Sequence, residues 1–291
     1  MNARFASLVL IEARKLRGRL LLWGSLAVLA LLVGVLHFML IVTLQHPSPQ
    51  VPAEAVAAIK SMLRWPAALE NALTFADGGG LGGLIMVVLA GAFVAQEITW
   101  HTAALWLSRA VGRGALLLAK FVVLAVAGWL VVLAALWAGG TVTGAYGLLA
   151  YHHLPWGQVD WPRLLLHTLA VAYSLFPYVA LAMLVAVVSR STVVTLGVSV
   201  GFNLLIENLL IQVLQMVSAA GATISGYLPA MLGRAITSSF TTAQANVEVG
   251  HANLPGLHLL SPTAAALLIA VYTGLLLAAA AFAFYKQDVT V

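Results

Sequence analysis

The sequence predicts an all-α integral membrane protein with six transmembrane helices, an N-terminal interfacial helix and both termini in the cytoplasm. Three observations support this fold class. The chain has 291 residues, of which 62% are hydrophobic and only 8% are charged, whereas a soluble domain carries about 25% charged residues. Long apolar runs recur from one end of the chain to the other. Most of the lysine and arginine residues lie close to the ends of those runs.

Six segments are long and apolar enough to cross a bilayer, because about 20 helical residues span a hydrocarbon core of ~30 Å. We place these spans at residues 20–44, 80–96, 115–138, 164–188, 192–217 and 262–285. An alternation of apolar and polar positions is missing, so the spans are predicted to be helices and not the strands of a barrel. We expect the first span to be retained, because its apolar region is too long for a signal peptide and ends in LQHPSP.

The positions of lysine and arginine predict the orientation. With a cytoplasmic N-terminus, ten of these residues lie in inner segments and four in outer segments. The inner ones are Arg4, Arg14, Lys15, Arg17, Arg19, Arg109, Arg113, Lys120, Arg190 and Lys286, and the outer ones are Lys60, Arg64, Arg163 and Arg234. This excess favours both termini inside. Membrane orientation thus accounts for the net charge of +5, and we expect no nucleic-acid partner.

The chain is predicted to form a single transmembrane domain over residues 1–291, with no soluble domain. Residues 1–19 have an apolar first half and a basic second half. This pattern is typical of a helix that lies along the inner surface of the membrane. Within it, Glu12 and Lys15 are three residues apart on a helix and can form an ion pair.

Two loops between the spans contain unusual residues. Residues 218–261 form the longest outer loop, and its apolar stretch ISGYLPAMLGRAI predicts a partly re-entrant hairpin. Such a hairpin is stable only where protein covers its backbone. Residues 97–114 form a short, charged inner loop between the second and third spans. Its length and composition are compatible with a helix.

Several kinds of site are excluded or not predicted. The chain has no cysteine, which excludes disulfides, thiolate metal sites and cysteine nucleophiles. Its histidines are scattered, and none has a recognised ligand spacing with a carboxylate, so we predict no metal site. The phosphate-binding pattern G-x-x-x-x-G-K-[ST] does not occur in the sequence. We therefore expect neither a cofactor nor a nucleotide on this chain.

The stretch GVSVG at residues 197–201 has two interpretations. It matches the G-x-S-x-G pattern of a nucleophile elbow, with Ser199 as the nucleophile. An elbow requires a strand, a turn and a helix, whereas this stretch lies inside an apolar span. The same letters form a G-x-x-x-G motif, which allows helices to pack closely. We favour packing and predict no catalytic residue, and the alternative is an intramembrane serine hydrolase that uses Ser199.

Glu207 is the only acidic residue well inside a predicted span. Ionisable groups inside a membrane usually face a partner or a watery cavity, because their burial in lipid is costly. Asn203 lies one turn earlier on the same face. We expect Asn203 and Glu207 either to bond neighbouring helices or to lie on the pathway of a transported substrate. A proton-coupled secondary transporter that uses Glu207 is therefore a second alternative function.

The inner loop begins with EITWHTAALWLSRAVGR, which contains an acid, two threonines, a leucine-rich turn and two arginines. Together with a later lysine, this order resembles the first cytoplasmic loop of type-2 ABC transporter permeases. The N-terminal EARKLRGR and the C-terminal FAFYKQDV are similar to the two ends of that family, so the resemblance covers the whole chain. The residues that carry the loop resemblance are Glu97, Thr102, Ser108, Arg109, Arg113 and Lys120.

The resemblance implies the permease subunit of an ATP-driven exporter, which is not itself an enzyme. Two copies of the chain, expected to be a homodimer, would form the pore. Each copy would rest on a separate ABC ATPase subunit that binds ATP and Mg²⁺. The 97–114 loop would be a coupling helix seated on that ATPase, and the implied location is the inner (plasma) membrane of a bacterium. The implied ATPase contacts are Glu97, Thr102, Ser108, Arg109 and Arg113.

Overall fold

The computed structural model describes residues 2–46, 52–100, 112–154, 156–241 and 260–286. Every element within these ranges is a helix. Six helical segments are long and apolar enough to cross a membrane, namely Leu20–Gln45, Leu81–Thr99, Arg113–Ala150, Trp161–Ser189, Thr192–Val217 and Pro262–Lys286. The described part of the chain thus confirms the predicted all-α fold with six spans.

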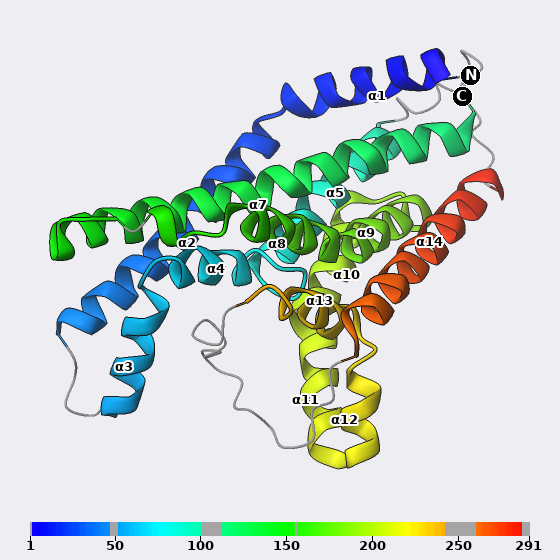
Figure 1. Ribbon diagram of the computed structural model, residues 1–291. Helices are drawn as coiled ribbons and strands as arrows, with labels where there is room; N and C mark the ends of the chain where they lie inside the picture. Colours follow the sequence, from blue (N-terminus) through cyan, green and yellow to red (C-terminus); the bar gives the residue numbers. More distant parts are fainter. Residues whose placement is uncertain (1, 47–51, 101–111, 155, 242–259, 287–291) are drawn as a thin grey trace.

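The chain begins with a bent pair of helices. α1 (Asn2–Arg17) and α2 (Leu20–Gln45) follow one another closely, and Figure 1 shows α1 turning away from the axis of α2. α1 lies on α7 (Arg113–Tyr151). Its apolar Leu8 faces this contact and is buried, whereas the basic Arg17 is exposed. The helix predicted over residues 1–19 is therefore amphipathic in the structure.

α7 is longer than the span predicted at 115–138. It has 39 residues, which corresponds to about 58 Å of helix. The predicted span ended before Gly139 and Gly140, and adjacent glycines weaken a helix. In the structure these glycines lie where other helices pack closely on α7. A Cβ atom at Gly139 would collide with Ala72 and His37. Packing thus keeps the helix intact beyond the glycines.

Two short helices connect α2 to the second span. α3 (Ala53–Met62) is partly exposed, whereas α4 (Ala67–Thr74) is buried along almost its whole length. The second span, α5 (Leu81–Thr99), lies inside the bundle and contacts α2, α7 and helices of the fourth and fifth spans. Figure 1 shows α5 behind α7. α5 is thus the helix around which several others pack.

The fourth span is interrupted in its middle. It consists of α8 (Trp161–Ser174) and α9 (Phe176–Ser189). The interruption is at Leu175, two residues before Pro177, which lacks a backbone N–H and whose ring disfavours a continuous helix. A single helix was expected here, and the proline accounts for the difference. α9 packs against both α5 and the last span.

The fifth span changes its helical form where the polar residues lie. It consists of α10 (Thr192–Gly201), a π-helical turn η2 (Phe202–Ile206) and α11 (Glu207–Val217). A π-turn inside an α-helix is uncommon and is frequent at functional sites. Asn203 lies in this turn, and Glu207 directly follows it.

The outer loop and the last span complete the bundle. The described part of the loop forms α12 (Ala219–Ser225) and α13 (Pro229–Thr237). α13 is buried and packs against α8 and α14 (Pro262–Lys286). Its backbone is therefore covered by protein, as a re-entrant segment requires.

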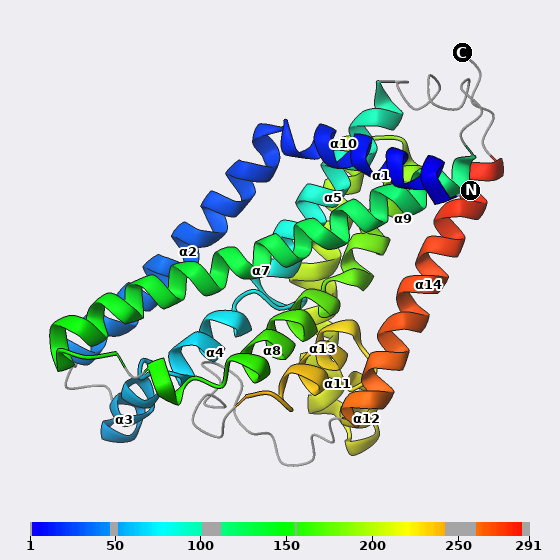
Figure 2. The same ribbon diagram turned by 45° about the horizontal axis from the view of Figure 1, so that its top comes forward.

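The two ends of the described chain lie on the same side of the molecule. Figures 1 and 2 show the start of α1, the start of α7 and the end of α14 close together. We call this the α1 side. α3 and α12 lie on the opposite side, which we call the α3 side. The end of α5 and the start of α7, between which the inner loop runs in the sequence, both lie on the α1 side.

Candidate functional site

Five charged side chains come together where α1, α5 and α7 meet. They are Glu12 and Lys15 of α1, Arg19 directly before α2, Glu97 of α5 and Lys120 of α7, and we call them the ionic cluster. Glu12 is fully buried, and Glu97 and Lys120 expose only 5% and 3% of their surface. Buried charges are costly unless they are paired. The cluster must therefore be held together by its internal contacts.

Two of the three cations of the cluster, Lys15 and Lys120, lie between its two carboxylates. The Nζ atom of Lys120 lies 2.7 Å from Oε2 of Glu12 and 2.7 Å from Oε2 of Glu97. Lys15 forms a second bridge, at 2.5 Å from Oε1 of Glu12 and 3.3 Å from Oε1 of Glu97. The contact between Lys15 and Glu12 confirms the predicted pairing within α1. Two lysines thus tie Glu12 of α1 to Glu97 of α5.

Arg19 and an aromatic ring complete the cluster. An Nη2 atom of Arg19 lies 3.8 Å from Glu97, and its Nη1 atom donates a hydrogen bond of 2.8 Å to Gln96. The ring centre of Phe93 lies 4.5 Å from the Lys120 ammonium and 5.0 Å from the Arg19 guanidinium. An aromatic face attracts cations. Phe93, one turn before Glu97, thus helps α5 to hold two of the three cations.

The last turn of α5 is also tied to the turn between α9 and α10. The Thr99 hydroxyl oxygen lies 2.9 Å from the carbonyl oxygen of Ala95 and 3.2 Å from that of Arg190. Arg190 ends α9 with a left-handed backbone, at φ 52°. The point at which the chain leaves α5 for the inner loop is therefore fixed to four elements: α1, α7, α9 and α10.

The point at which the chain returns from the inner loop is fixed as well. Arg113, the first residue of α7, donates from Nη1 to the carbonyl oxygens of Phe284 and Tyr285, at 2.8 and 2.9 Å. These carbonyls belong to the last turn of α14, where intrahelical donors are missing. A cation is also favoured there by the helix dipole. Arg113 therefore links the start of α7 to the end of α14.

The structure locates two of the five predicted ATPase contacts. Glu97 and Arg113 lie at the two ends of the inner loop, and both side chains contact other parts of this chain. Thr102, Ser108 and Arg109 lie outside the described residues. Glu97 and Arg113 are thus anchors of the loop within this chain, and contact with an ATPase remains a prediction for all five residues.

A second buried polar group surrounds Glu207. The Tyr178 hydroxyl donates a hydrogen bond of 2.6 Å to Oε2 of Glu207, and the Ala230 amide donates one of 2.8 Å to Oε1. Ala230 lies in the first turn of α13, where amide groups have no intrahelical acceptor. Glu207 exposes only 1% of its surface. The carboxylate therefore pins α11 to both α9 and α13.

Asn203 extends this group to the glycine-rich turn before α5. Its Nδ2 atom donates a hydrogen bond of 2.9 Å to the carbonyl oxygen of Gly78. The Gly78 amide in turn donates one of 3.0 Å to the Ser174 hydroxyl. A Cβ atom at Gly78 would collide with Ser174 and Tyr178, so glycine is required by this close approach. We call Gly78, Tyr178, Asn203, Glu207 and Ala230 the polar junction.

The geometry gives no support to the two alternative functions. Ser199 lies within helix α10, is fully buried, and its hydroxyl has no hydrogen-bond partner among the described residues. A nucleophile elbow with a neighbouring base is therefore not formed there. Both oxygens of Glu207 accept hydrogen bonds from neutral donors, as expected of a structural carboxylate. Among the described residues, no group of three or more potential ligands could hold a metal ion.

Sequence reasoning missed the partners that complete both groups. Lys120 was recognised as an inner cation and as part of the loop resemblance, but not as a partner of Glu12, which lies 108 positions earlier. Tyr178 and the first turn of α13 gave no signal that they meet Glu207. One signal was available in the sequence: Pro177 directly precedes Tyr178, and Pro229 directly precedes Ala230. Proline marks helix starts and kinks.

The polar junction yields a prediction about stability. Replacing Glu207 by Leu leaves the Tyr178 hydroxyl and the Ala230 amide without an acceptor, and each unsatisfied buried group costs about 1–3 kcal/mol. We expect Glu207→Leu to lower the thermal unfolding midpoint of the purified full chain clearly, and Glu207→Gln, which keeps one acceptor, to lower it less. Combining Glu207→Gln with Tyr178→Phe should be less than additive, because the two residues share one bond. A Glu207→Leu protein as stable as the wild type would contradict this assignment.

The comparison with known families agrees with these features. The model of the ABC-2 family transporter proteins matches residues 6–289, which includes the ionic cluster, the inner loop and the polar junction. No curated protein matches the chain. Because the family match extends over nearly all of the 291 residues, the resemblance to type-2 ABC permeases is confirmed, and the chain belongs to the ABC-2 family of transporter membrane proteins.

Proposed function

We propose that this chain is the membrane subunit of an ATP-driven exporter and that a separate ATPase moves it through the 97–114 loop. The observation that carries this proposal is the double anchoring of the loop. Glu97 fixes its start within the ionic cluster, and Arg113 fixes its end on α14. A loop anchored in this way transmits a displacement to the bundle, whereas a loosely attached loop would absorb it.

The anchors define which helices the ATPase would move. A push on the loop reaches α1 through Lys15 and Glu12, and it reaches α7 through Lys120. It reaches the turn between α9 and α10 through Thr99 and Arg190. In this proposal Thr102, Ser108 and Arg109 provide the docking surface, while Glu97 and Arg113 transmit its movement. ATP and Mg²⁺ are bound by the partner, because the chain has no phosphate-binding loop.

The proposed orientation places the α1 side in the cytoplasm. The excess of lysine and arginine on inner segments supports it. The inner loop then faces the compartment that contains ATP, and α3 and α12 face outward. We further propose that the protein lies in the plasma membrane of a bacterium. The inner face of that membrane borders the compartment that contains ATP, and inner segments there carry the excess of lysine and arginine.

A second copy of the chain is the proposed partner within the membrane. The fifth span exposes large apolar side chains, such as Val198, Leu205 and Leu209. On the same span, Gly197 and Gly201 face open space, with no atom within 4 Å of an added Cβ. The predicted G-x-x-x-G packing motif therefore has no partner among the residues that the structure describes. Packing of these glycines on a second copy accounts for both observations.

Asn203 and Glu207 remain our candidates for the substrate pathway. In the single chain their side chains are enclosed by the polar junction. A role in transport therefore requires that the junction opens during the cycle. Movement of α5 provides a route, because Gly78 lies in the turn three residues before this helix and accepts the hydrogen bond from Asn203.

The first test concerns the partner. The purified chain alone should hydrolyse no ATP, whereas tagged chain isolated from its own membrane should bring an ATPase subunit with it. Native mass measurement should give two copies of each subunit, and inactivating the phosphate-binding lysine of the ATPase should abolish hydrolysis by the complex. ATP turnover by the isolated chain, or a complex with one permease copy, would contradict the proposal.

The second test separates docking from anchoring. Arg109→Glu should reduce the recovered ATPase by roughly tenfold or more, because a reversed charge at a complementary interface costs several kcal/mol, and should leave thermal stability unchanged. Arg113→Glu should in addition lower the unfolding midpoint, because it removes the donor to the end of α14. Arg17→Glu, an exposed charge reversal on α1, serves as the control and should behave as wild type. Full ATPase recovery with Arg109→Glu would remove the loop from the interface.

A further inference from the structure

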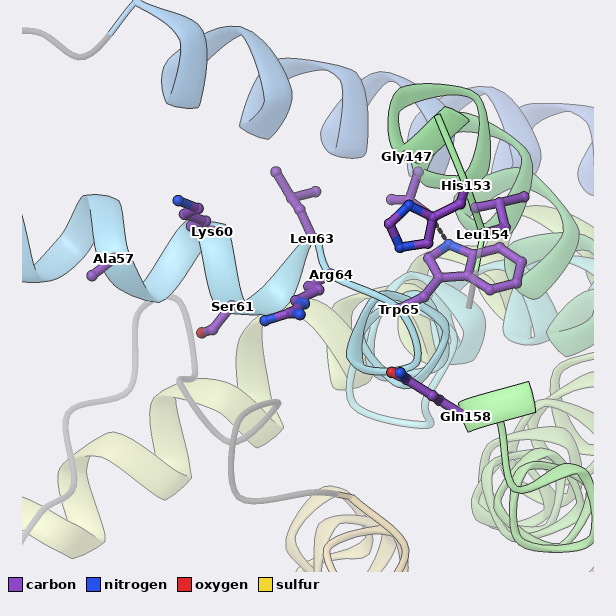
Figure 3. Close-up of a pocket in the computed structure, with 11 residues that line it drawn as sticks. Ala57, Lys60, Ser61, Leu63, Arg64, Trp65, Gly147, His153, Leu154 and Gln158 are labelled. Atoms are coloured by element: carbon purple, nitrogen blue, oxygen red, sulfur yellow. Dashed lines mark hydrogen bonds between the residues drawn. The ribbon is translucent and has the colours of Figure 1, made fainter. Parts of the chain in front are cut away.

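A cavity of about 450 Å³ opens on the α3 side, away from the ionic cluster and the polar junction. Figure 3 shows its walls. One wall is formed by α3 and the segment that follows it, with Lys60, Arg64 and Trp65. The facing wall is formed by the chain after α7, with Leu154 and Gln158. The cavity thus lies between segments far apart in the sequence.

The fully charged side chains that line the cavity are both cations. Lys60 and Arg64 are four residues apart at the end of α3 and are both exposed. His153 and the amide of Gln158 supply further polar groups. None of the described residues that line the cavity is acidic. Because cations without a neighbouring carboxylate attract anions, the cavity is suited to an anionic group.

Three neighbouring tryptophans indicate the position of the cavity along the membrane normal. The Trp65 indole donates a hydrogen bond of 3.1 Å to the Thr143 hydroxyl, which fixes this ring in the cavity wall. The rings of Trp65 and Trp156 pack edge to face, with 4.9 Å between their centres. The rings of Trp156 and Trp161 are stacked, with 6.0 Å between their centres. Tryptophan is enriched at membrane–water interfaces. The cavity therefore lies at the level of lipid headgroups.

Apolar groups line the rest of the cavity and preserve its shape. Ala57, Leu63 and Leu154 contribute hydrocarbon surface beside the two cations. Gly147 allows Leu154 to approach α7 closely, since an added Cβ would lie 3.1 Å from its Cδ2 atom. A ligand that fits this lining has an anionic group next to an apolar part. A phospholipid has both at this depth.

We propose that this cavity binds the phosphate of an anionic phospholipid from the leaflet on the α3 side. The Arg64 guanidinium can hold two phosphate oxygens in parallel, and Lys60 adds a compact charge. The apolar wall then contacts the glycerol and the start of an acyl chain. Only the description of this leaflet as the outer one rests on the proposed orientation, because binding itself does not depend on it.

The test is a lipid titration of the purified full chain in neutral detergent, with the thermal unfolding midpoint as the readout. Phosphatidylglycerol should raise the midpoint saturably, and phosphatidylcholine should raise it less. Lys60→Ala combined with Arg64→Ala should weaken the apparent affinity for phosphatidylglycerol by about tenfold. Lys60→Arg keeps both charges and the Arg64 guanidinium and should retain most of the affinity.

A matched control excludes general charge effects. Arg14→Ala with Arg17→Ala removes two exposed cations from α1 on the opposite side and should leave the Lys60- and Arg64-dependent stabilisation in place. Equal phosphatidylglycerol affinity for the wild type and the Lys60→Ala, Arg64→Ala protein would overturn the proposal. So would an equal stabilisation by inorganic phosphate or glycerol 3-phosphate, which would assign the cavity to a soluble anion. Neither outcome depends on an ATPase, so failure here is separate from failure of the proposed function.

Discussion

Buried carboxylates need cations, and this requirement organises the α1 side of the protein. Glu12 and Glu97 come from helices that are far apart in the sequence, and both are almost removed from solvent. Placed together without Lys15, Arg19 and Lys120, they would repel one another in a medium of low dielectric constant. Removing one partner from a buried ion pair costs about 3–5 kcal/mol. The position of α1 against α5 and α7 is therefore set by charge pairing as well as by apolar contact.

α5 connects this cluster to the polar junction. Its last turn carries Glu97, and the glycine-rich turn before its first residue contains Gly78, which bonds both Ser174 and Asn203. Most residues of α5 are buried, and close-packed interiors have low compressibility and transmit strain. In the proposed mechanism, a displacement of the inner loop would reach the far half of the bundle, where Glu207 holds α13. In our account, α5 acts as one rigid helix that receives movement at the ionic cluster and transmits it to the polar junction.

The sequence was sufficient for features that depend on local composition. Six spans follow from hydropathy, and the Glu12–Lys15 pair follows from helical spacing. Features that depend on distant contacts were not accessible. The continuation of α7 past Gly139 requires α4 and α2 to pack on it. Glu207 was recognised as a polar residue that needs a partner, but its donors, Tyr178 and Ala230, are fixed only by the tertiary fold.

The central claim, that the ionic cluster transmits movement of the inner loop across the bundle, can be tested by one distance measurement. The chain has no cysteine, so Ile224→Cys, an exposed position on α12, provides a unique spin-label site in each copy. In the assembled complex, ATP binding should change the distance between the two labels. Introducing Glu97→Gln, which keeps the shape of the side chain and removes its charge, should abolish this change while the ATPase remains bound. An unchanged ATP-dependent distance shift in the Glu97→Gln complex would contradict the account.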